Sequence, residues 1–168
     1  MEKRKKRSGI LHRVVLLLWV LAVNSAVHVL EIPFGWLMFL SNIMFFLVEG
    51  KDMKEKLLTV ECGGLVGLTF AILMIKSMMA LEPVLGDYLG FLLPLALFVG
   101  TLIMLRPTLP KIFNNVGFAY LTVSCIDPAA LLSNIPRYYL TFLIGSLVFN
   151  GGAILLMKLT TAYLAKRT

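Results

Sequence analysis

Apolar residues fill most of this chain in six continuous stretches, and short polar, proline or glycine breaks separate them. The stretches cover residues 14–32, 34–48, 57–81, 88–105, 112–126 and 138–165. Charge, proline or glycine stands at the breaks, for example at Glu82-Pro83 and Arg106-Pro107, as expected for helix ends. A helix needs about 20 apolar residues to cross a bilayer. The pattern predicts an all-α, polytopic membrane protein with six transmembrane segments.

Two of these stretches are too short for an ordinary crossing. The second and the fifth hold only fifteen residues each, and they occupy corresponding places in the two halves of the chain. Short segments in corresponding places are a sequence indication of a midplane binding site in transport proteins. We therefore expect these two segments to contribute to a binding site near the membrane midplane.

A fourteen-residue sequence occurs twice, 82 positions apart. Residues 63–76 read GGLVGLTFAILMIK and residues 145–158 read GSLVFNGGAILLMK, with seven identical positions. Duplicated halves are typical of many transport folds. With three crossings in each half, the halves must run in opposite directions through the membrane. The sequence predicts two inverted three-helix repeats, residues 10–82 and 92–164.

The charge distribution predicts the orientation. Of the sixteen Lys and Arg residues, fourteen fall on the side of the two termini and two, Lys76 and Arg137, on the other. The positive-inside rule then places both termini in the cytoplasm. We expect a basic cytoplasmic tail at 1–13 and a single transmembrane domain at 14–165. The net charge of +7 does not indicate nucleic-acid binding, because no basic stripe alternates with stacking aromatics.

Glycines lie on the long third and sixth stretches. Small residues allow helix backbones to approach closely in a membrane. We expect helix packing at the positions Gly63, Gly67, Gly145 and Gly152. A pore lining is the alternative, and the two interpretations are compatible. Such faces also favour a homo-oligomer.

Neutral polar residues interrupt the two short stretches. They are Ser41, Asn42, Asn114, Asn115, Tyr120 and Ser124. Amides and hydroxyls in hydrocarbon need partners or water, and they suit an uncharged polar solute because they both donate and accept hydrogen bonds. These residues are the candidate pore or substrate-binding set, with Asn42 and Ser124 meeting at a constriction. The alternative is interhelical hydrogen bonding that fixes the bundle, with Asn114 and Asn115 simply interfacial.

Two ionisable residues are candidates for gating or proton coupling. Glu61 lies one turn inside the third stretch, and His28 lies near the outer end of the first, beside Glu31. An embedded carboxylate facing a cavity and a titrating histidine would suit those roles. Alternatively, Glu61 reaches back to the headgroup zone and His28 is an ordinary interfacial residue.

Catalytic and metal-binding patterns are absent from the sequence. Cys62 and Cys125 fall in or beside apolar stretches without nearby His partners, so we expect small buried side chains, no metal and no disulfide. No nucleophile has a placed base, and no phosphate loop is present. We expect a protein that is not an enzyme and that needs no cofactor.

Several short motifs resemble a family of small bacterial inner-membrane proteins grouped only as a domain of unknown function. They are Gly35-Trp36 with Phe39, Gly63 in a long helix, and Phe113 followed by Gly117-Phe118-Ala119. The likeness covers most of residues 10–160 but not the Asn114-Asn115 pair or the charged loop 49–56. The resemblance implies an inner-membrane location and no biochemical activity.

Two functions follow from these features. The first is a channel or facilitator for a small polar, uncharged solute, which rests on the repeat and the two short segments. The second is a non-transporting accessory or assembly subunit, which rests on the glycine-rich faces. The expected partners are the lipid bilayer, a small polar solute and a second copy of the chain.

Overall fold

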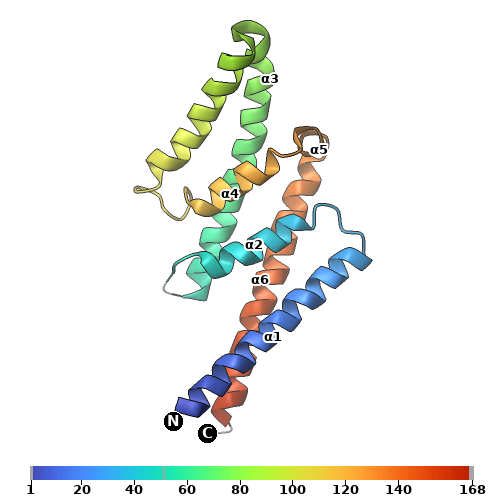
Figure 1. Ribbon diagram of the computed structural model, residues 1–168, viewed down its shortest axis with the longest axis vertical. Coiled ribbons are helices and arrows are strands. Elements are labelled where there is room, and N and C mark those ends of the chain that lie inside the picture. Colours follow the sequence, from blue (N-terminus) through green and yellow to red (C-terminus); the bar gives the residue numbers. More distant parts are fainter. Residues whose placement is uncertain (1, 51, 167–168) are drawn as a thin grey trace. The chain divides into compact units, whose positions relative to one another are not determined.

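The chain folds into helices throughout its described part. A computed structural model describes the backbone of residues 2–50 and 52–166 and the side chains of residues 10–50 and 52–165. The helices are α1 Glu2–Val29, α2 Trp36–Leu47, α3 Met53–Leu105, α4 Asn115–Ser124, α5 Pro128–Ser133 and α6 Ile135–Lys166 (Figure 1). The all-α prediction is confirmed. The side chains of the basic run Lys3–Arg7, of Lys51 and of Lys166-Arg167 lie outside the described residues.

Helix α3 consists of two limbs that reverse direction at Gly86. Gly86 has φ 76° and ψ 165°, which breaks the helix into limbs at 53–85 and 87–105 (Figure 1). Glycine reaches this conformation without steric cost, and Pro83 lies one turn before it. At Gly90 an added Cβ would lie 2.5 Å from the Cα of Glu82, so the turn is tight. The reversal falls between the third and fourth predicted stretches.

Polar side chains cap three helices at their starts. Asp52, Asn114 and Asp127 each accept hydrogen bonds from backbone N–H groups in the first turn of α3, α4 and α5 respectively. Helix α5 was not among the predicted segments, because Asp127-Pro128 resembles a helix stop. The structure uses the same two residues as a start, with Asp127 as the cap and Pro128 at the first position, where proline is well tolerated.

The helices form two compact units. Unit 1 comprises Met1–Asn42 and Thr141–Thr168, and unit 2 comprises Ile43–Leu140. In unit 1, α1 lies antiparallel to α6, so the start of α1 lies beside the end of α6 (Figure 1). Two contacts fix this pairing: the indole N–H of Trp19 donates to the Phe149 carbonyl at 2.9 Å, and His12 Nε2 lies 3.1 Å from Thr161 Oγ1.

In unit 2, α4 packs against both limbs of α3. A Cβ at Gly67 would collide with the carbonyl oxygen of Gly117, so the two backbones are in contact. Met74, Leu102 and Leu121, from the two limbs and α4, form a buried apolar cluster. The ring centroids of Phe70 and Phe98 lie 5.2 Å apart beside this cluster. The short helix therefore fills the space along the α3 hairpin.

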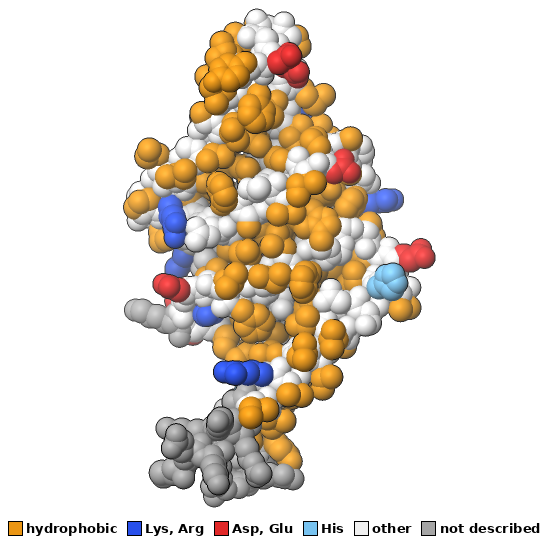
Figure 2. All heavy atoms as spheres, in the orientation of Figure 1, with side chains coloured by type: hydrophobic (Ala, Val, Ile, Leu, Met, Phe, Trp, Pro, Cys, Tyr) orange, Lys and Arg blue, Asp and Glu red, His pale blue; other side chains and the backbone are white. Residues whose placement is uncertain are grey.

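The surface composition suits a membrane. Figure 2 shows hydrophobic side chains over most of the visible face, with few charged side chains among them. Among the described residues three helices, at Ile10–Val29, Met53–Leu105 and Ile135–Ala165, are long and apolar enough to cross a membrane. Helices α2 and α4 hold 12 and 10 residues. At 1.5 Å per residue they are about 18 and 15 Å long, roughly half the thickness of a hydrocarbon core.

Candidate functional site

An open hollow of about 460 Å³ lies at the junction of α2, α3 and α4 in unit 2, and we call it the unit 2 hollow. Its polar lining comprises Glu49, Thr59, Arg106, Asn114 and Asn115; its apolar lining comprises Met44, Leu47, Val48, Pro110 and Val116. Small-molecule sites commonly have volumes of roughly 300–1,000 Å³ with a few polar groups on an apolar wall. The hollow brings together two of the predicted site residues, Asn114 and Asn115.

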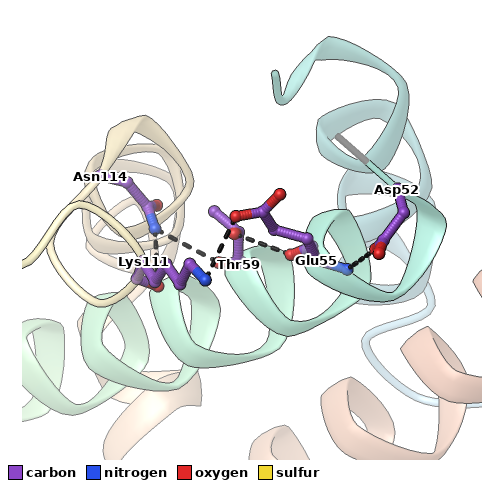
Figure 3. Close-up of polar contacts among 5 residues, drawn as sticks. All are labelled: Asp52, Glu55, Thr59, Lys111 and Asn114. Carbon is purple, nitrogen blue, oxygen red and sulfur yellow. Dashed lines mark hydrogen bonds and ion pairs between the residues drawn. The ribbon is translucent and has the colours of Figure 1, made fainter. Parts of the chain in front are cut away.

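Asn114 is the central structural residue of this wall. Its Oδ1 accepts from the N–H groups of Val116 and Gly117 at 2.9 and 3.2 Å, which caps α4. Its Nδ2 donates to the carbonyls of Thr59 and Lys111 at 3.2 and 3.1 Å (Figure 3). The side-chain amide is thus engaged on both its oxygen and its nitrogen, and it positions α4 on the first limb of α3.

Gly63 is the reason that Asn114 fits there. A Cβ at Gly63 would fall on the Oδ1 atom of Asn114. Asn115, the neighbouring predicted residue, is exposed and makes no hydrogen bond within the described part of the chain. Of the Asn114-Asn115 pair, therefore, only Asn115 is free to contact a solute.

An ion pair ties the loop before α4 to the start of α3. Lys111 Nζ lies 3.2 Å from Glu55 Oε1, and Asp52 caps the same turn by accepting from the Glu55 N–H at 2.7 Å (Figure 3). The hydroxyl of Thr59 donates to the Glu55 carbonyl at 2.9 Å. An exposed ion pair of this kind contributes only about 0–1 kcal/mol. The ammonium group of Lys111 is therefore already paired with the carboxylate of Glu55.

Glu49 and Arg106 face the unit 2 hollow without pairing. Both side chains are exposed and line the same hollow. Within the described residues, the side chains of Glu49 and Arg106 form no ion pair or hydrogen bond, either with each other or with any other group. Their charges are opposite, so the hollow presents one cation and one anion to whatever enters it.

Unit 1 contains a second open hollow, of about 560 Å³, which we call the unit 1 hollow. It is lined by Asn24, Val27, His28, Glu31, Ile32, Gly35, Trp36 and Phe39. Three lining positions, 24, 28 and 32, lie 82 residues before 106, 110 and 114, which line the unit 2 hollow. His28 is exposed here, at the end of α1.

The end of α1 beside this hollow has an unusual backbone. The Ile32 N–H donates to the Val27 carbonyl at 3.0 Å and the Glu31 N–H to the His28 carbonyl at 3.2 Å, the hydrogen-bond pattern of a Schellman cap. Glu31 has φ 49° at the position that this motif usually gives to glycine. A non-glycine residue in the left-handed region costs about 1 kcal/mol or more.

Ser41 and Asn42 belong to a buried amide and hydroxyl network in unit 1. Asn42 Nδ2 donates to Asn150 Oδ1 at 3.2 Å, and Asn150 Nδ2 donates to Ser41 Oγ at 2.8 Å. Ser146 Oγ lies 3.5 Å from the same Asn150 nitrogen. Asn42 is 3% exposed and the other three side chains are fully buried. The network joins α2 to α6, which favours a role in packing for Ser41 and Asn42.

Asn150 and Ser146 were missing from the predicted set. Both lie within the apolar stretch 138–165, where the criterion that selected Asn42, an amide among hydrocarbon residues, also applies to Asn150. Ser146 gives a weaker signal, because a helical serine satisfies itself easily through its own backbone.

The remaining polar candidates lie on α4. Tyr120 is fully buried, and its Cβ lies 2.8 Å from the place that a Cβ on Gly67 would take. Ser124 is 1% exposed, and its Oγ has no hydrogen-bond partner within the described residues. Asn42 belongs to unit 1 and Ser124 to unit 2, so their meeting at a constriction stays a prediction.

The remaining predicted residues are Glu61, the packing glycines and the two cysteines, and the structure gives their burial and contacts. Glu61 is half-buried on the first limb of α3. A Cβ at Gly145 would collide with Met38 of α2, and one at Gly152 with the indole of Trp19. Cys62 and Cys125 are free and half-buried, and the described residues contain no group of His, Cys, Asp and Glu side chains that could hold a metal ion.

Comparison with known proteins gave no match. No protein-family model, curated protein or solved structure matches this chain. The resemblance to bacterial inner-membrane proteins of unknown function therefore stays a prediction.

Proposed function

We propose that this protein is an inner-membrane facilitator for a small polar solute without net charge. The observation that supports this most is the correspondence between the two hollows. Each unit has one, and three pairs of lining positions, 24/106, 28/110 and 32/114, are related by the same offset of 82 that relates the duplicated sequences. Equivalent openings in two halves suit a solute entering from either side.

The packing within each unit supports the inverted repeats. In unit 1 the hairpin of α1 and α2 packs with α6, and Gly145 of α6 lies against Met38 of α2. In unit 2 the second limb of α3 and α4 pack with the first limb, and Gly67 lies against α4. At an offset of 82 these are the same three elements. Each unit then joins the hairpin of one repeat to the long helix of the other.

The proposed topology has six membrane-embedded segments with both termini in the cytoplasm. Because His12 lies beside Thr161, the start of α1 and the end of α6 share one end of unit 1. The excess of Lys and Arg on that side favours the cytoplasm. By this topology the unit 1 hollow opens outward and the unit 2 hollow opens inward. Helices α2 and α4 reach only part of the way across.

Solute flux into liposomes tests this function. Purified full-length protein is reconstituted, and the uptake of small amides, neutral amino acids, monocarboxylates and inorganic ions is compared with protein-free liposomes. We expect faster uptake of net-neutral polar solutes and no change for ions, because no fixed net charge offsets ion desolvation. If no solute enters faster than in protein-free liposomes, the facilitator proposal is wrong.

A matched pair of variants on α4 sharpens this test. Asn115→Leu changes the exposed amide at the unit 2 hollow, and we expect it to lower flux severalfold. Thr122→Val is the control, because the Thr122 hydroxyl bonds only to the Phe118 carbonyl of its own helix, at 2.9 Å. Equal flux in both variants would remove Asn115 from the solute path.

One observation favours the second function, a non-transporting accessory subunit. The polar groups expected to line a constriction, Ser41 and Asn42, are engaged with Asn150 in a buried contact. Such a contact suits a rigid module that a partner protein recognises. Absence of flux for every solute, together with a membrane protein that co-purifies in defined stoichiometry, would support this function.

A further inference from the structure

We infer that the unit 2 hollow binds a small zwitterion, with the ligand ammonium at Glu49 and its acidic group at Arg106. This inference names the ligand class of the proposed solute site and so rests on the proposed function. Binding and flux are measured separately, so either idea can fail without the other.

Two unmatched opposite charges line the unit 2 hollow. Glu49 and Arg106 line one hollow, and within the described residues neither has a partner. An Arg guanidinium binds carboxylate or phosphate oxygens through two parallel N–H groups. A carboxylate accepts hydrogen bonds from the N–H groups of an ammonium. One ligand that carries both groups can satisfy both side chains.

The neighbouring cation Lys111 does not change this charge balance. Lys111 lies at the same loop, but its ammonium pairs with Glu55 at 3.2 Å and it does not line the hollow. The described lining therefore carries one positive and one negative charge, which sum to zero. A simple anion would leave Glu49 unmatched and a simple cation would leave Arg106 unmatched, whereas a zwitterion leaves neither.

The rest of the lining also suits a small zwitterion. Met44, Leu47, Val48 and Val116 form an apolar wall that suits a short carbon skeleton, and the exposed Asn115 amide offers a further donor and acceptor. The volume of about 460 Å³ accommodates a small amino acid or the phosphoethanolamine headgroup of a lipid. Both sources share the required chemistry, a primary ammonium beside an acidic group.

The experiment uses full-length protein in nanodiscs made from phosphatidylcholine and phosphatidylglycerol. In the soluble arm, L-alanine and glycerophosphoethanolamine, both zwitterions without net charge, are titrated calorimetrically, with propionate and ethylamine as singly charged analogues. In the lipid arm, phosphatidylethanolamine is added to the nanodiscs in an amount equal to phosphatidylcholine, and its retention over phosphatidylcholine is measured by native mass spectrometry. We expect a zwitterion to bind at least about tenfold more tightly than either analogue, the difference that one lost charged hydrogen bond causes. The arm that responds identifies the source.

Two variants test the assignment of each charge. Glu49→Gln should weaken zwitterion binding about tenfold and bring propionate to equal strength, because only Arg106 then remains charged. Arg106→Gln should weaken it similarly and bring ethylamine to equal strength. Lys111→Gln is the control outside the hollow and should change neither affinity. Glu49→Asp and Arg106→Lys keep the charges. If they bind the zwitterion, the loss of affinity in the glutamine variants is due to the missing charge and not to misfolding.

The outcomes are decisive in both directions. Binding in either arm with reversal of charge preference in the two variants supports the inference. Three results would overturn it: absence of zwitterion binding in the soluble and the lipid arm alike, tighter binding of propionate or ethylamine than of L-alanine and glycerophosphoethanolamine, or an equal loss of affinity in Lys111→Gln. Flux without such binding would overturn the inference and leave the facilitator proposal intact.

Discussion

Replacing Asn150 with leucine tests whether the buried network holds α2 to α6. The Asn150 amide donates to Ser41 at 2.8 Å and accepts from Asn42 at 3.2 Å, and all three side chains are buried. Leucine has a similar volume, and Leu68 occupies the corresponding position in the first half of the chain. The substitution therefore removes the polar contacts with little change in packing.

The expected loss follows from counting these bonds. Interhelical hydrogen bonds in membrane proteins contribute about 0.6 kcal/mol on average and about 1.7 at most. A buried group that is left without a partner costs about 1–3 kcal/mol. Asn150→Leu removes the two bonds between the helices and the 3.5 Å contact with Ser146 of its own helix, and we expect a loss of about 1–3 kcal/mol of unfolding free energy. Asn42→Leu removes one, and we expect about 1 kcal/mol. The double variant should cost less than the sum, because the two residues share a bond.

Unfolding by SDS in mixed micelles measures these differences. The indole of Trp19 donates to the carbonyl of Phe149, next to Asn150, so tryptophan fluorescence reports on this region. Asn24→Leu is the matched control, because the Asn24 amide donates only to Val20 of its own helix, at 2.8 Å. If Asn150→Leu is as stable as the wild type, or if Asn24→Leu loses as much, the network does not hold α2 to α6.

The same variants separate packing from transport. Asn42 is 3% exposed and bonded to Asn150, so we expect Asn42→Leu to conduct as well as the wild type per folded molecule. A variant that is stable but conducts severalfold less would instead place Asn42 on the solute path.

Three further changes test other positions. Gly63→Ala should lower the unfolding free energy by about 1–2 kcal/mol, since its Cβ displaces the Asn114 cap, whereas Gly151→Ala, with open space around it, should be neutral or stabilising; equal SDS midpoints would refute this. Ser124→Ala should stabilise by up to about 1 kcal/mol because its buried hydroxyl has no partner within the described residues, and a loss on SDS unfolding would indicate a partner. Glu31→Gly should raise thermal stability by about 1 kcal/mol by relieving the left-handed backbone, and no gain would show that the glutamate side chain compensates.

Local sequence patterns were sufficient to predict the helical segments other than α5. Continuous apolar stretches and their breaks are properties of short segments, so helical structure in all six stretches followed directly. The break at Glu82-Pro83 also marked the end of the first α3 limb, because proline and the nearby Gly86 interrupt regular helix. The short lengths of α2 and α4 were visible for the same reason.

Capping residues were harder to interpret from sequence. Asn114 has the composition of a solute-binding or interfacial amide, but its side chain caps α4 and bridges to Thr59. Asp127-Pro128 has the composition of a stop but starts α5. An acidic or amide cap serves a helix that follows it, so the same residue types stand at ends and at starts.

Partners across the chain could not be predicted at all. Asn42 and Asn150 lie 108 residues apart, and only the packing of α2 on α6 brings them together. The convergence of Glu49 and Arg106 on one hollow likewise depends on how α4 lies against the α3 hairpin. Local composition carries no information about such pairs, because it does not fix which helix faces which.

The two halves of the chain differ at the positions of the buried Asn42–Asn150 pair, and this difference changes the hydrogen bonding in unit 2. At an offset of 82, Asn42 corresponds to Ser124 and Asn150 corresponds to Leu68. In unit 1 the side chains of Asn42 and Asn150 form a hydrogen bond with each other, and this bond joins α2 to α6. In unit 2 leucine replaces the partner, which leaves Ser124 unsatisfied, and unmatched charges line the hollow instead. Under the proposed inverted repeats, the polar groups of unit 1 hold two helices together, whereas those of unit 2 are left for the proposed ligand.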